Sequence, residues 1–156
     1  MIELLRVEAD DVRLGRLLQL YMHEWSDRLP VPIGPDALYT YPSLPLYRSN
    51  PSRGAWLFLD AQQLPIGFVL TMRDDDGCTH VEEFFVLAGA RRRGIGLEAA
   101  GRVLATRPGP WSLTVRPENP TGLAFWRRAL SGADERQERG DDGIVRTRLS
   151  TVVAGG

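Results

Sequence analysis

The sequence contains no lysine, so all 19 of its Lys-or-Arg residues are arginines. This absence excludes Schiff-base chemistry and the phosphate loop G-x-x-x-x-G-K-[ST], which both require a lysine amine. Cysteine is nearly absent too, and the single Cys78 excludes a framework of internal disulfides. No run approaches the ~18 consecutive apolar residues of a membrane span, and no basic stretch leads into an apolar one at the start. We therefore expect a cytoplasmic protein with no membrane partner.

A large net charge is also missing. The 19 arginines are balanced by 20 acidic residues, which gives a formal net charge of −1 at pH 7. Such a balance argues against a general nucleic-acid partner or an anionic membrane surface. The length of 156 residues is close to the usual size of one domain. We therefore expect residues 1–156 to form a single domain with its own hydrophobic core.

The first third of the chain predicts one helix and one long loop. Residues 10–26 carry apolar side chains at steps of three and four on one face, which predicts a helix. These side chains are Leu14, Leu17, Leu18, Tyr21 and Trp25. Residues 29–55 are rich in proline and tyrosine, which predicts an ordered loop with room for one helical turn.

The remaining predicted elements indicate an α+β fold with a mixed sheet. Strands are predicted at residues 2–7, 56–59, 66–72, 80–86 and 111–115, with two more around the turn at 140–143. Short connections make the second, third and fourth of these antiparallel neighbours. Helices are predicted over residues 94–106 and from Pro120, where Asn119 has the pattern of an N-cap.

Residues 82–97 combine a strand, a short loop and the start of a helix. The first amides of a helix have no partner within it, so with the positive end of the helix dipole they can bind an anion such as a pyrophosphate. Gly94 and Gly96 leave the backbone open to phosphate oxygens, and residues 91–93 are three arginines. The alternative is a glycine-rich turn with three solvated arginines. A match of residues 94–99 to the dinucleotide fingerprint G-x-G-x-x-G/A lacks the βαβ context that this motif needs.

Three segments together resemble the GNAT (general N-acetyltransferase) superfamily. Residues 91–96 (RRRGIG) match the pyrophosphate loop R/Q-x-x-G-x-G/A, and residues 81–86 (VEEFFV) look like a strand of diamine acetyltransferases. Residues 119–126 (NPTGLAFW) are similar to the N-x-x-A…F-Y/W segment of the family. The resemblance covers most of the chain. It implies a mostly antiparallel sheet flanked by helices, and transfer of acetyl from acetyl-CoA to a primary amine by direct attack in a ternary complex.

The resemblance also implies which residues bind acetyl-CoA. The loop amides would hold the pyrophosphate, and the strand end would pair with the pantetheine arm and polarise the thioester carbonyl. The implied residues are Phe85, Val86, Arg91, Arg92, Arg93, Gly94, Ile95, Gly96, Asn119 and Trp126. Two of these have simpler interpretations, because Asn119 is also a helix N-cap and Trp126 suits core packing.

Glu82 and Glu83 are the candidate catalytic residues. An alkylamine is mostly protonated at neutral pH, and a carboxylate on this strand can remove its proton directly or through water. Strand alternation sends adjacent side chains to opposite faces, so only one glutamate serves unless a bulge turns both. Solvated carboxylates on an outer face are the alternative. The acceptor is expected to be a small-molecule or peptide amine, against a pocket that includes Tyr21, Tyr39 and Tyr41.

One departure from the family concerns the proton for the leaving thiolate. Many members have a tyrosine where this chain has Trp126, and an indole N–H is not a practical acid. Water or one of Tyr21, Tyr39, Tyr41 and Tyr47 then serves, or no acid is needed. A non-catalytic acyl-CoA-binding or sensing module is therefore the alternative function. The family resemblance implies a homodimer, and no feature of the sequence itself indicates the oligomeric state.

The residues around the acidic turn are not expected to form a site. Residues 74–76 are three aspartates that read as a solvated turn, since no further metal ligands are expected to cluster there. His80 could act as a base but is more simply structural, and Cys78 has no base motif beside it to make it a nucleophile. The sequence thus predicts no metal.

Overall fold

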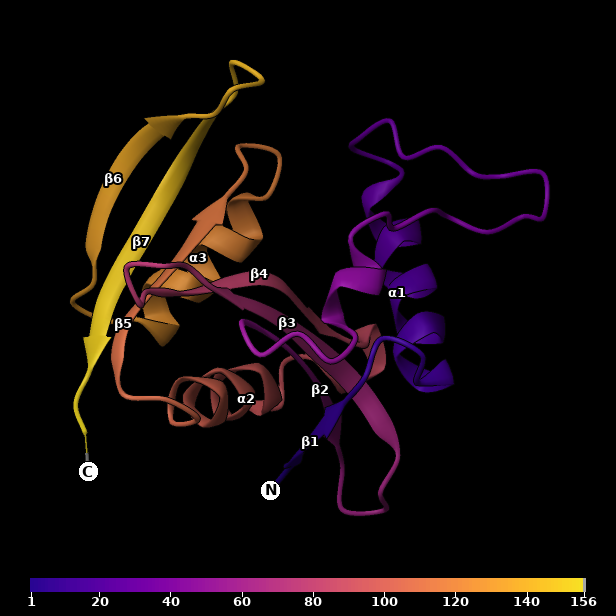
Figure 1. The fold of residues 1–156 in the computed structure, drawn as a ribbon, viewed down its shortest axis with the longest axis horizontal. Coiled ribbons are helices and arrows are strands. Elements are labelled where there is room, and N and C mark those ends of the chain that lie inside the picture. The colour runs from indigo at the N-terminus through magenta and orange to yellow at the C-terminus, as the bar shows by residue number, and fades with distance from the viewer. Residues whose placement is uncertain (156) are drawn as a thin grey trace.

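One seven-stranded sheet runs through the molecule in the order β1-β2-β3-β4-β5-β7-β6 (Figure 1). The computed structural model describes residues 1–155. The strands are β1 (Glu3–Val7), β2 (Arg53–Leu59), β3 (Pro65–Arg73), β4 (Thr79–Val86), β5 (Gly109–Val115), β6 (Asp134–Arg139) and β7 (Val145–Val153). Neighbouring strands are antiparallel except β4 and β5, which are parallel. The predicted α+β class, with a mixed and mostly antiparallel sheet, is confirmed.

Helices cover both faces of this sheet. The helices are α1 (Val12–Trp25), α2 (Ile95–Leu104) and α3 (Pro120–Ala129), with the short 3-10 helices η1 (Leu44–Tyr47) and η2 (Ala88–Ala90). Helix α1 and η1 pack on one face around Leu57 and Phe68. Helices α2 and α3 pack on the other face around Phe58 and Trp111.

Helix α1 shows how the sequence sets an element boundary. The carboxylate of Asp11 accepts a 2.9 Å hydrogen bond from the Arg13 amide, so Asp11 is the N-cap and the helix begins at Val12. The expected start at residue 10 was therefore too early. The predicted apolar stripe is confirmed at Leu14, Leu17 and Leu18, which are buried against the sheet.

The proline-rich stretch is irregular, as the sequence predicts, and contains one helical turn. That turn is η1, whose Tyr47 side chain is buried in the core. The irregular segment is shorter than expected, because β2 begins at Arg53 rather than at residue 56. The loop passes above α1 in Figure 1, and its Tyr41 reaches Glu83 of β4.

The junction between β4 and β5 positions the site. Only three residue pairs join these strands, the last being Val81 with Leu113. Beyond that pair β4 and β5 separate (Figure 1). One edge of β4 therefore has no strand partner from Glu82 to Val86. Its backbone groups on that edge can bind a ligand, apart from the Val86 carbonyl, which accepts a hydrogen bond from Arg91.

Candidate functional site

A bulge in β4 brings both candidate glutamates to one face of the sheet. Leu70 of β3 pairs with Glu83 and the next residue, Thr71, pairs with Val81, so Glu82 is the extra residue. Both carboxylates then reach side chains of the α1 and η1 layer. Strand alternation alone would send the two side chains to opposite faces, and the bulge, the exception expected from the sequence, turns both to one face.

Glu83 is enclosed by two phenols. Tyr41 Oη donates a 2.9 Å hydrogen bond to Oε1, and Tyr21 donates to Oε2. Burial raises the pKa of the Glu83 carboxyl, while the two phenols oppose that shift and the nearby charge of Glu82 adds to it. A carboxyl with a raised pKa is a stronger base than a solvated glutamate.

Glu82 is held differently, in contact with solvent. Its Oε2 accepts a 2.8 Å hydrogen bond from Arg53 Nη1 and another from Tyr47. The Glu82 side chain keeps 30% of its surface exposed. A cavity of about 190 Å³ lies beside it and is lined in part by Tyr47, Arg53 and Glu8. This carboxylate is therefore the one that an incoming cation can touch.

The tyrosines divide into two groups. Burial is the main cause that raises the pKa of Tyr21, Tyr41 and Tyr47, so these phenols stay protonated and donate hydrogen bonds to the glutamates. Tyr39 lies elsewhere, with its hydroxyl 3.0 Å from Nδ1 of His23. Two of the three tyrosines expected at the acceptor pocket thus lie at the glutamates, and Tyr39 does not.

The start of α2 has the features of an anion site. Gly94 is its N-cap in the left-handed conformation with φ of 77°, and it has no side chain to cap the helix. The other two α-helices are capped by Asp11 and Asn119. The first amides of α2 therefore lack a side-chain acceptor, and the positive end of the helix dipole is open to an anion.

Arg91 fastens the loop to its surroundings. Its Nε donates a 2.7 Å hydrogen bond to the carbonyl of Val86, and its Nη2 contacts both carboxylate oxygens of Glu24 at 2.7 and 2.8 Å. Its guanidinium also lies 5.6 Å from the centre of the Phe85 ring. Arg92 and Arg93 are exposed and pair with no carboxylate within residues 1–155. These two are the arginines free to meet a phosphate.

The two loop glycines have different roles. A Cβ at Gly94 would meet nothing within 4 Å, so this glycine is required by its backbone conformation. A Cβ at Gly96 would lie 3.1 Å from the Phe125 ring, so this glycine makes room for α3. Gly96 thus has a packing role in the structure, and the approach of phosphate oxygens to either glycine stays a prediction. Ile95 opens the helix between them.

The end of β4 presents alternate residues to the gap. The amide of Leu87 bonds to the carbonyl of Ile66, so alternation directs the backbone of Phe85 toward β3 and that of Phe84 and Val86 toward the gap. The bond from Arg91 to the Val86 carbonyl agrees with this direction. Phe84 thus joins Val86 as a candidate to pair with a ligand in the gap.

Asn119 and Trp126 have the structural roles that their simpler interpretations predict. Asn119 Oδ1 accepts a 2.9 Å hydrogen bond from the Gly122 amide and caps α3. Trp126 is 8% exposed and packs with ring centres 5.0 Å from both Phe84 and Phe125. Contact of either residue with a ligand stays a prediction.

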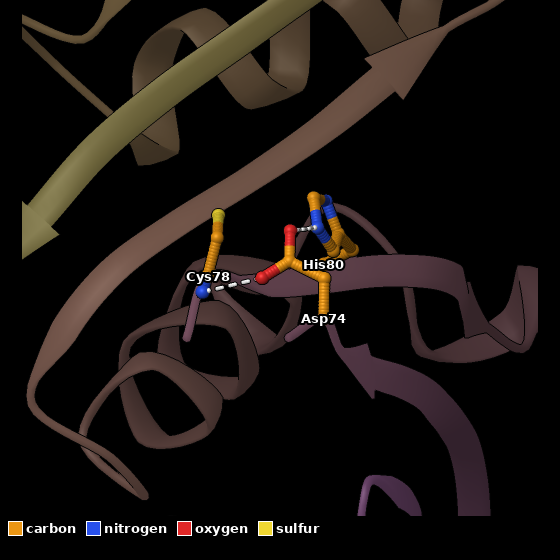
Figure 2. A group of neighbouring side chains, drawn as sticks. All are labelled: Asp74, Cys78 and His80. Carbon is orange, nitrogen blue, oxygen red and sulfur yellow. Dashed lines mark hydrogen bonds and ion pairs between the residues drawn. The ribbon is translucent and has the colours of Figure 1, made fainter. Parts of the chain in front are cut away.

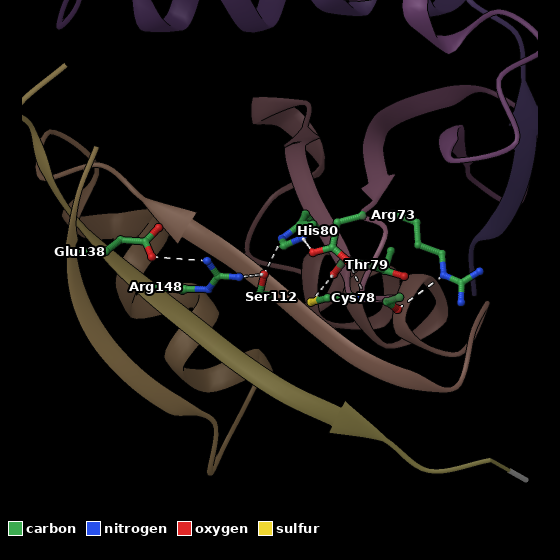
Figure 3. A network of polar contacts seen from close by, with 9 residues as sticks. Arg73, Cys78, Thr79, His80, Ser112, Glu138 and Arg148 are labelled. Atoms are coloured by element: carbon green, nitrogen blue, oxygen red, sulfur yellow. Dashed lines mark hydrogen bonds and ion pairs between the residues drawn. The ribbon is translucent and has the colours of Figure 1, made fainter. Parts of the chain in front are cut away.

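A second polar cluster lies at the turn between β3 and β4. Asp74, Cys78 and His80 bring one possible metal-ligand atom each to within 4.8 Å of one another (Figure 2). A chain of contacts continues from His80 to Ser112 and from there to Arg148 (Figure 3). The expectation that no further ligands cluster at the aspartates is wrong, because the hairpin turn returns β4 to Asp74.

Other contacts at the site were outside the reach of sequence reasoning. Arg53 and Glu24 carry no signal in the sequence, and nothing in the sequence pairs Tyr47 with Glu82. Arg53 lies 29 residues from Glu82, and Arg91 lies 67 residues from Glu24. Only the assembled sheet brings such pairs together.

Comparison with known proteins identifies the fold and the family. A model of the acetyltransferase (GNAT) family matches residues 16–130. A GNAT-family acetyltransferase from Staphylococcus aureus Mu50 superimposes with a TM-score of 0.73 and 14% identity, over 99% of this chain and 100% of that chain. An acetyltransferase from Thermus thermophilus superimposes with a TM-score of 0.72 and 19% identity, over 98% of this chain and 97% of that chain. These structures share the fold of this chain.

A third structure contains ligands. The spermidine N-acetyltransferase from Vibrio cholerae, in complex with CoA and spermine, gives a TM-score of 0.71 and 15% identity, over 97% of this chain and 95% of that chain. No curated protein sequence matches this chain significantly. Among residues 1–155, no helix is both long enough and apolar enough to cross a membrane.

Proposed function

Because the chain belongs to the acetyltransferase (GNAT) family, we propose that it is an N-acetyltransferase that moves the acetyl group of acetyl-CoA to a primary amine of a small molecule. The observation that carries the proposal is the pair of glutamates beside the gap between β4 and β5. A carboxyl group that can accept the proton of the amine lies there on β4. The free edge of the same strand can bind the thioester.

The acyl carrier would bind along a path from the loop to the gap. Its pyrophosphate would sit on the uncapped amides that follow Gly94, with Arg92 and Arg93 beside it. Its pantetheine arm would extend along the free edge of β4, toward the point where Val81 and Leu113 end the strand pairing. An amide of β4 that faces the gap would then polarise the thioester carbonyl as negative charge develops on its oxygen.

The amine would meet the glutamates from the other side. Glu82 is exposed enough to attract the alkylammonium ion, and Glu83 has the raised pKa that suits a general base. The Glu83 carboxylate takes one proton from the ammonium ion, directly or through one water, which frees the nitrogen lone pair. The lone pair attacks the thioester carbon, the carbon–sulfur bond breaks, and the second nitrogen proton passes to water. The thiolate leaves with the bond electrons and takes a proton from water, because the nearby phenols donate to the glutamates.

Amines are favoured as acceptors by the charge of this pocket. Glu82 and Glu83 lie near Arg53, and the adjacent cavity is lined by both Glu8 and Arg6, so the carboxylates exceed the arginines by one. The similar Vibrio cholerae enzyme is named for spermidine and was solved with spermine, which supports small amines as the first acceptors to test.

The decisive experiment is an amine panel with acetyl-CoA, in which release of the free thiol is measured. We expect turnover on at least one polyamine or monoamine, and a loss of about 10²–10⁴-fold in kcat/KM when Glu83→Gln is introduced. Acetyl-CoA should raise the melting temperature of both proteins, while NAD should not. Turnover that is unchanged in Glu83→Gln would contradict the assignment of the base.

The alternative function is an acyl-CoA-binding module without turnover. The observation that favours it is the burial of Trp126 in the core, where many family members have a phenolic acid. Stabilisation by acetyl-CoA without thiol release on any amine would select this alternative.

A further inference from the structure

The hairpin between β3 and β4 places three different ligand types together. The turn is closed by hydrogen bonds from the Asp74 amide to the Cys78 carbonyl and from the Gly77 amide to the Asp74 carbonyl. Gly77 has φ of 86°, which this turn requires. The spacing Asp-x₃-Cys-x-His then brings a carboxylate, a thiol and an imidazole to one side of the hairpin (Figure 2).

Two atoms of these residues already have partners outside the cluster of three ligand atoms. Asp74 Oδ1 accepts a 2.8 Å hydrogen bond from the Cys78 amide, and Nδ1 of His80 lies 2.6 Å from the Ser112 hydroxyl. The remaining ligand atoms are Oδ2 of Asp74 and Nε2 of His80, which face each other at 2.7 Å, and the sulfur of Cys78, whose one contact is a weak 3.9 Å hydrogen bond to the Thr79 carbonyl. A histidine that ligates a metal through one nitrogen usually bonds a polar group through the other.

Ser112 is well placed to fix the imidazole tautomer. It is 2% exposed, so it is not available as a nucleophile. Its hydroxyl accepts a 3.0 Å hydrogen bond from Arg148 and has a second lone pair that can accept a proton from Nδ1 (Figure 3). At 2.7 Å from Asp74 Oδ2, Nε2 carries a proton that a metal ion would displace. Nδ1 would then donate to Ser112, and the lone pair of Nε2 would become available as a ligand.

From this arrangement we propose that Asp74, Cys78 and His80 bind one Zn²⁺ ion, with water as the fourth ligand. Ligand atoms around tetrahedral zinc lie roughly 3.3–3.7 Å apart for bonds of ~2.0–2.3 Å, so small side-chain rotations bring the three atoms into range. A thiolate beside an imidazole favours zinc over Mg²⁺ or Ca²⁺, which prefer oxygen ligands.

Charge and exposure agree with this ion. The carboxylate and a thiolate neutralise the two positive charges of zinc. Of the two nearby arginines, Arg148 is paired with Glu138 and Arg73 donates to the Gly77 carbonyl. The side chains of His80 and Asp74 are 20% and 33% exposed, which leaves a path for the ion and room for water. Through Ser112, the ion would tie the hairpin to β5 at the short junction of the two strands. This site is independent of the proposed transfer reaction.

Cobalt spectroscopy tests the proposal. Co²⁺ added to untagged, chelator-treated protein should bind one ion per chain, with the visible bands of a tetrahedral site and a near-ultraviolet thiolate charge-transfer band. Cys78 is the only cysteine, so that band has one source. One equivalent of Zn²⁺ should displace the cobalt, and bound Zn²⁺ should protect Cys78 from alkylation in the unmodified chain.

Matched variants complete the experiment. Cys78→Ser should abolish the charge-transfer band, and Ser112→Ala should weaken Co²⁺ binding by about 10–100-fold through the lost partner of His80. Asp75→Asn, on the same turn but outside the cluster, should bind as the unmodified protein does. Absence of the band in the unmodified protein, or Co²⁺ binding that Cys78→Ser leaves unchanged, would overturn the proposal. Stabilisation of each variant by acetyl-CoA serves as the folding control.

Discussion

Tyr41 Oη donates a 2.9 Å hydrogen bond to Oε1 of Glu83, although the two residues lie 42 positions apart in the chain. This bond joins the proline-rich loop to the bulged part of β4. The loop that borders the acceptor pocket and the carboxyl proposed as the base are therefore placed together. A change in the loop is expected to alter the basicity of Glu83 as well as the shape of the pocket.

Removing this bond should shift the pH dependence of the reaction. The Tyr41 phenol lowers the pKa of Glu83 against the larger effect of burial, so Tyr41→Phe should raise that pKa further. The base acts when it is deprotonated, and kcat/KM falls as the pH drops through its pKa. We expect the acid limb of the pH–rate profile to move to higher pH in Tyr41→Phe. Tyr39→Phe is the control, since that hydroxyl contacts His23, and an unmoved limb in Tyr41→Phe would contradict the link.

The Glu83 carboxyl should cost stability at neutral pH. Its pKa in the folded chain is raised above the unfolded value of roughly 4.3. The folded state therefore binds this proton more tightly, and stability falls as the pH rises from the unfolded pKa through the folded one. A neutral side chain avoids this loss. We expect Glu83→Gln to melt at a higher temperature than the unmodified protein at pH ~7, by about 2–4 °C for each ~1 kcal/mol gained.

The same difference should shrink as the pH falls below the unfolded pKa of roughly 4.3, where Glu83 becomes protonated in both states. Glu135→Gln is a control of opposite sign, because the hydrogen bond from Arg127 lowers the pKa of Glu135. That exposed variant should lose a little stability at neutral pH, and scanning calorimetry across the pH range measures both effects. A lower melting temperature for Glu83→Gln at pH ~7 would show that the phenols outweigh burial.

The sequence predicts the loop, its strand and the two adjacent glutamates because these signals are local. Residues 91–96 and Glu82–Glu83 lie within one strand–loop–helix segment, so their spacing is preserved in the fold. The bulge is not local, since it depends on how Thr71 of β3 pairs with Val81. Register of this kind is set by the packing of a whole sheet face, which a pattern within one strand does not contain.

The cluster at Asp74 could have been found from the sequence. A turn signal at residues 74–77 already predicts a hairpin, and a hairpin returns the chain beside its own start. Cys78 and His80 stand directly after that turn. The expectation of no further ligands was wrong because a run of aspartates suggests only the oxygen ligands of a calcium site, whereas the hairpin assembles a mixed set.

The ion pair of Arg91 and Glu24 should contribute to folding more than to binding. Arg91→Gln removes the bonds to Val86 and Glu24, and we expect it to lower the melting temperature by a few degrees. Glu24→Gln alone should cost less, because exposed ion pairs are worth about 0–1 kcal/mol. A double-mutant cycle separates the two contributions, and a coupling energy of zero would assign the whole effect to the Val86 bond.

Gly94 should be more sensitive to substitution than its neighbours in the loop. Its φ of 77° places it in the left-handed region, where a side chain costs about 1–2 kcal/mol, and relief of that strain would move the first amides of α2. We expect Gly94→Ala to weaken acetyl-CoA binding about tenfold by calorimetry, with a lower melting temperature. Gly89→Ala is the matched control, since a Cβ there meets nothing within 4 Å and its φ is ordinary. If Gly94→Ala bound acetyl-CoA as tightly as the unmodified protein, the amides that follow Gly94 would not be the pyrophosphate site.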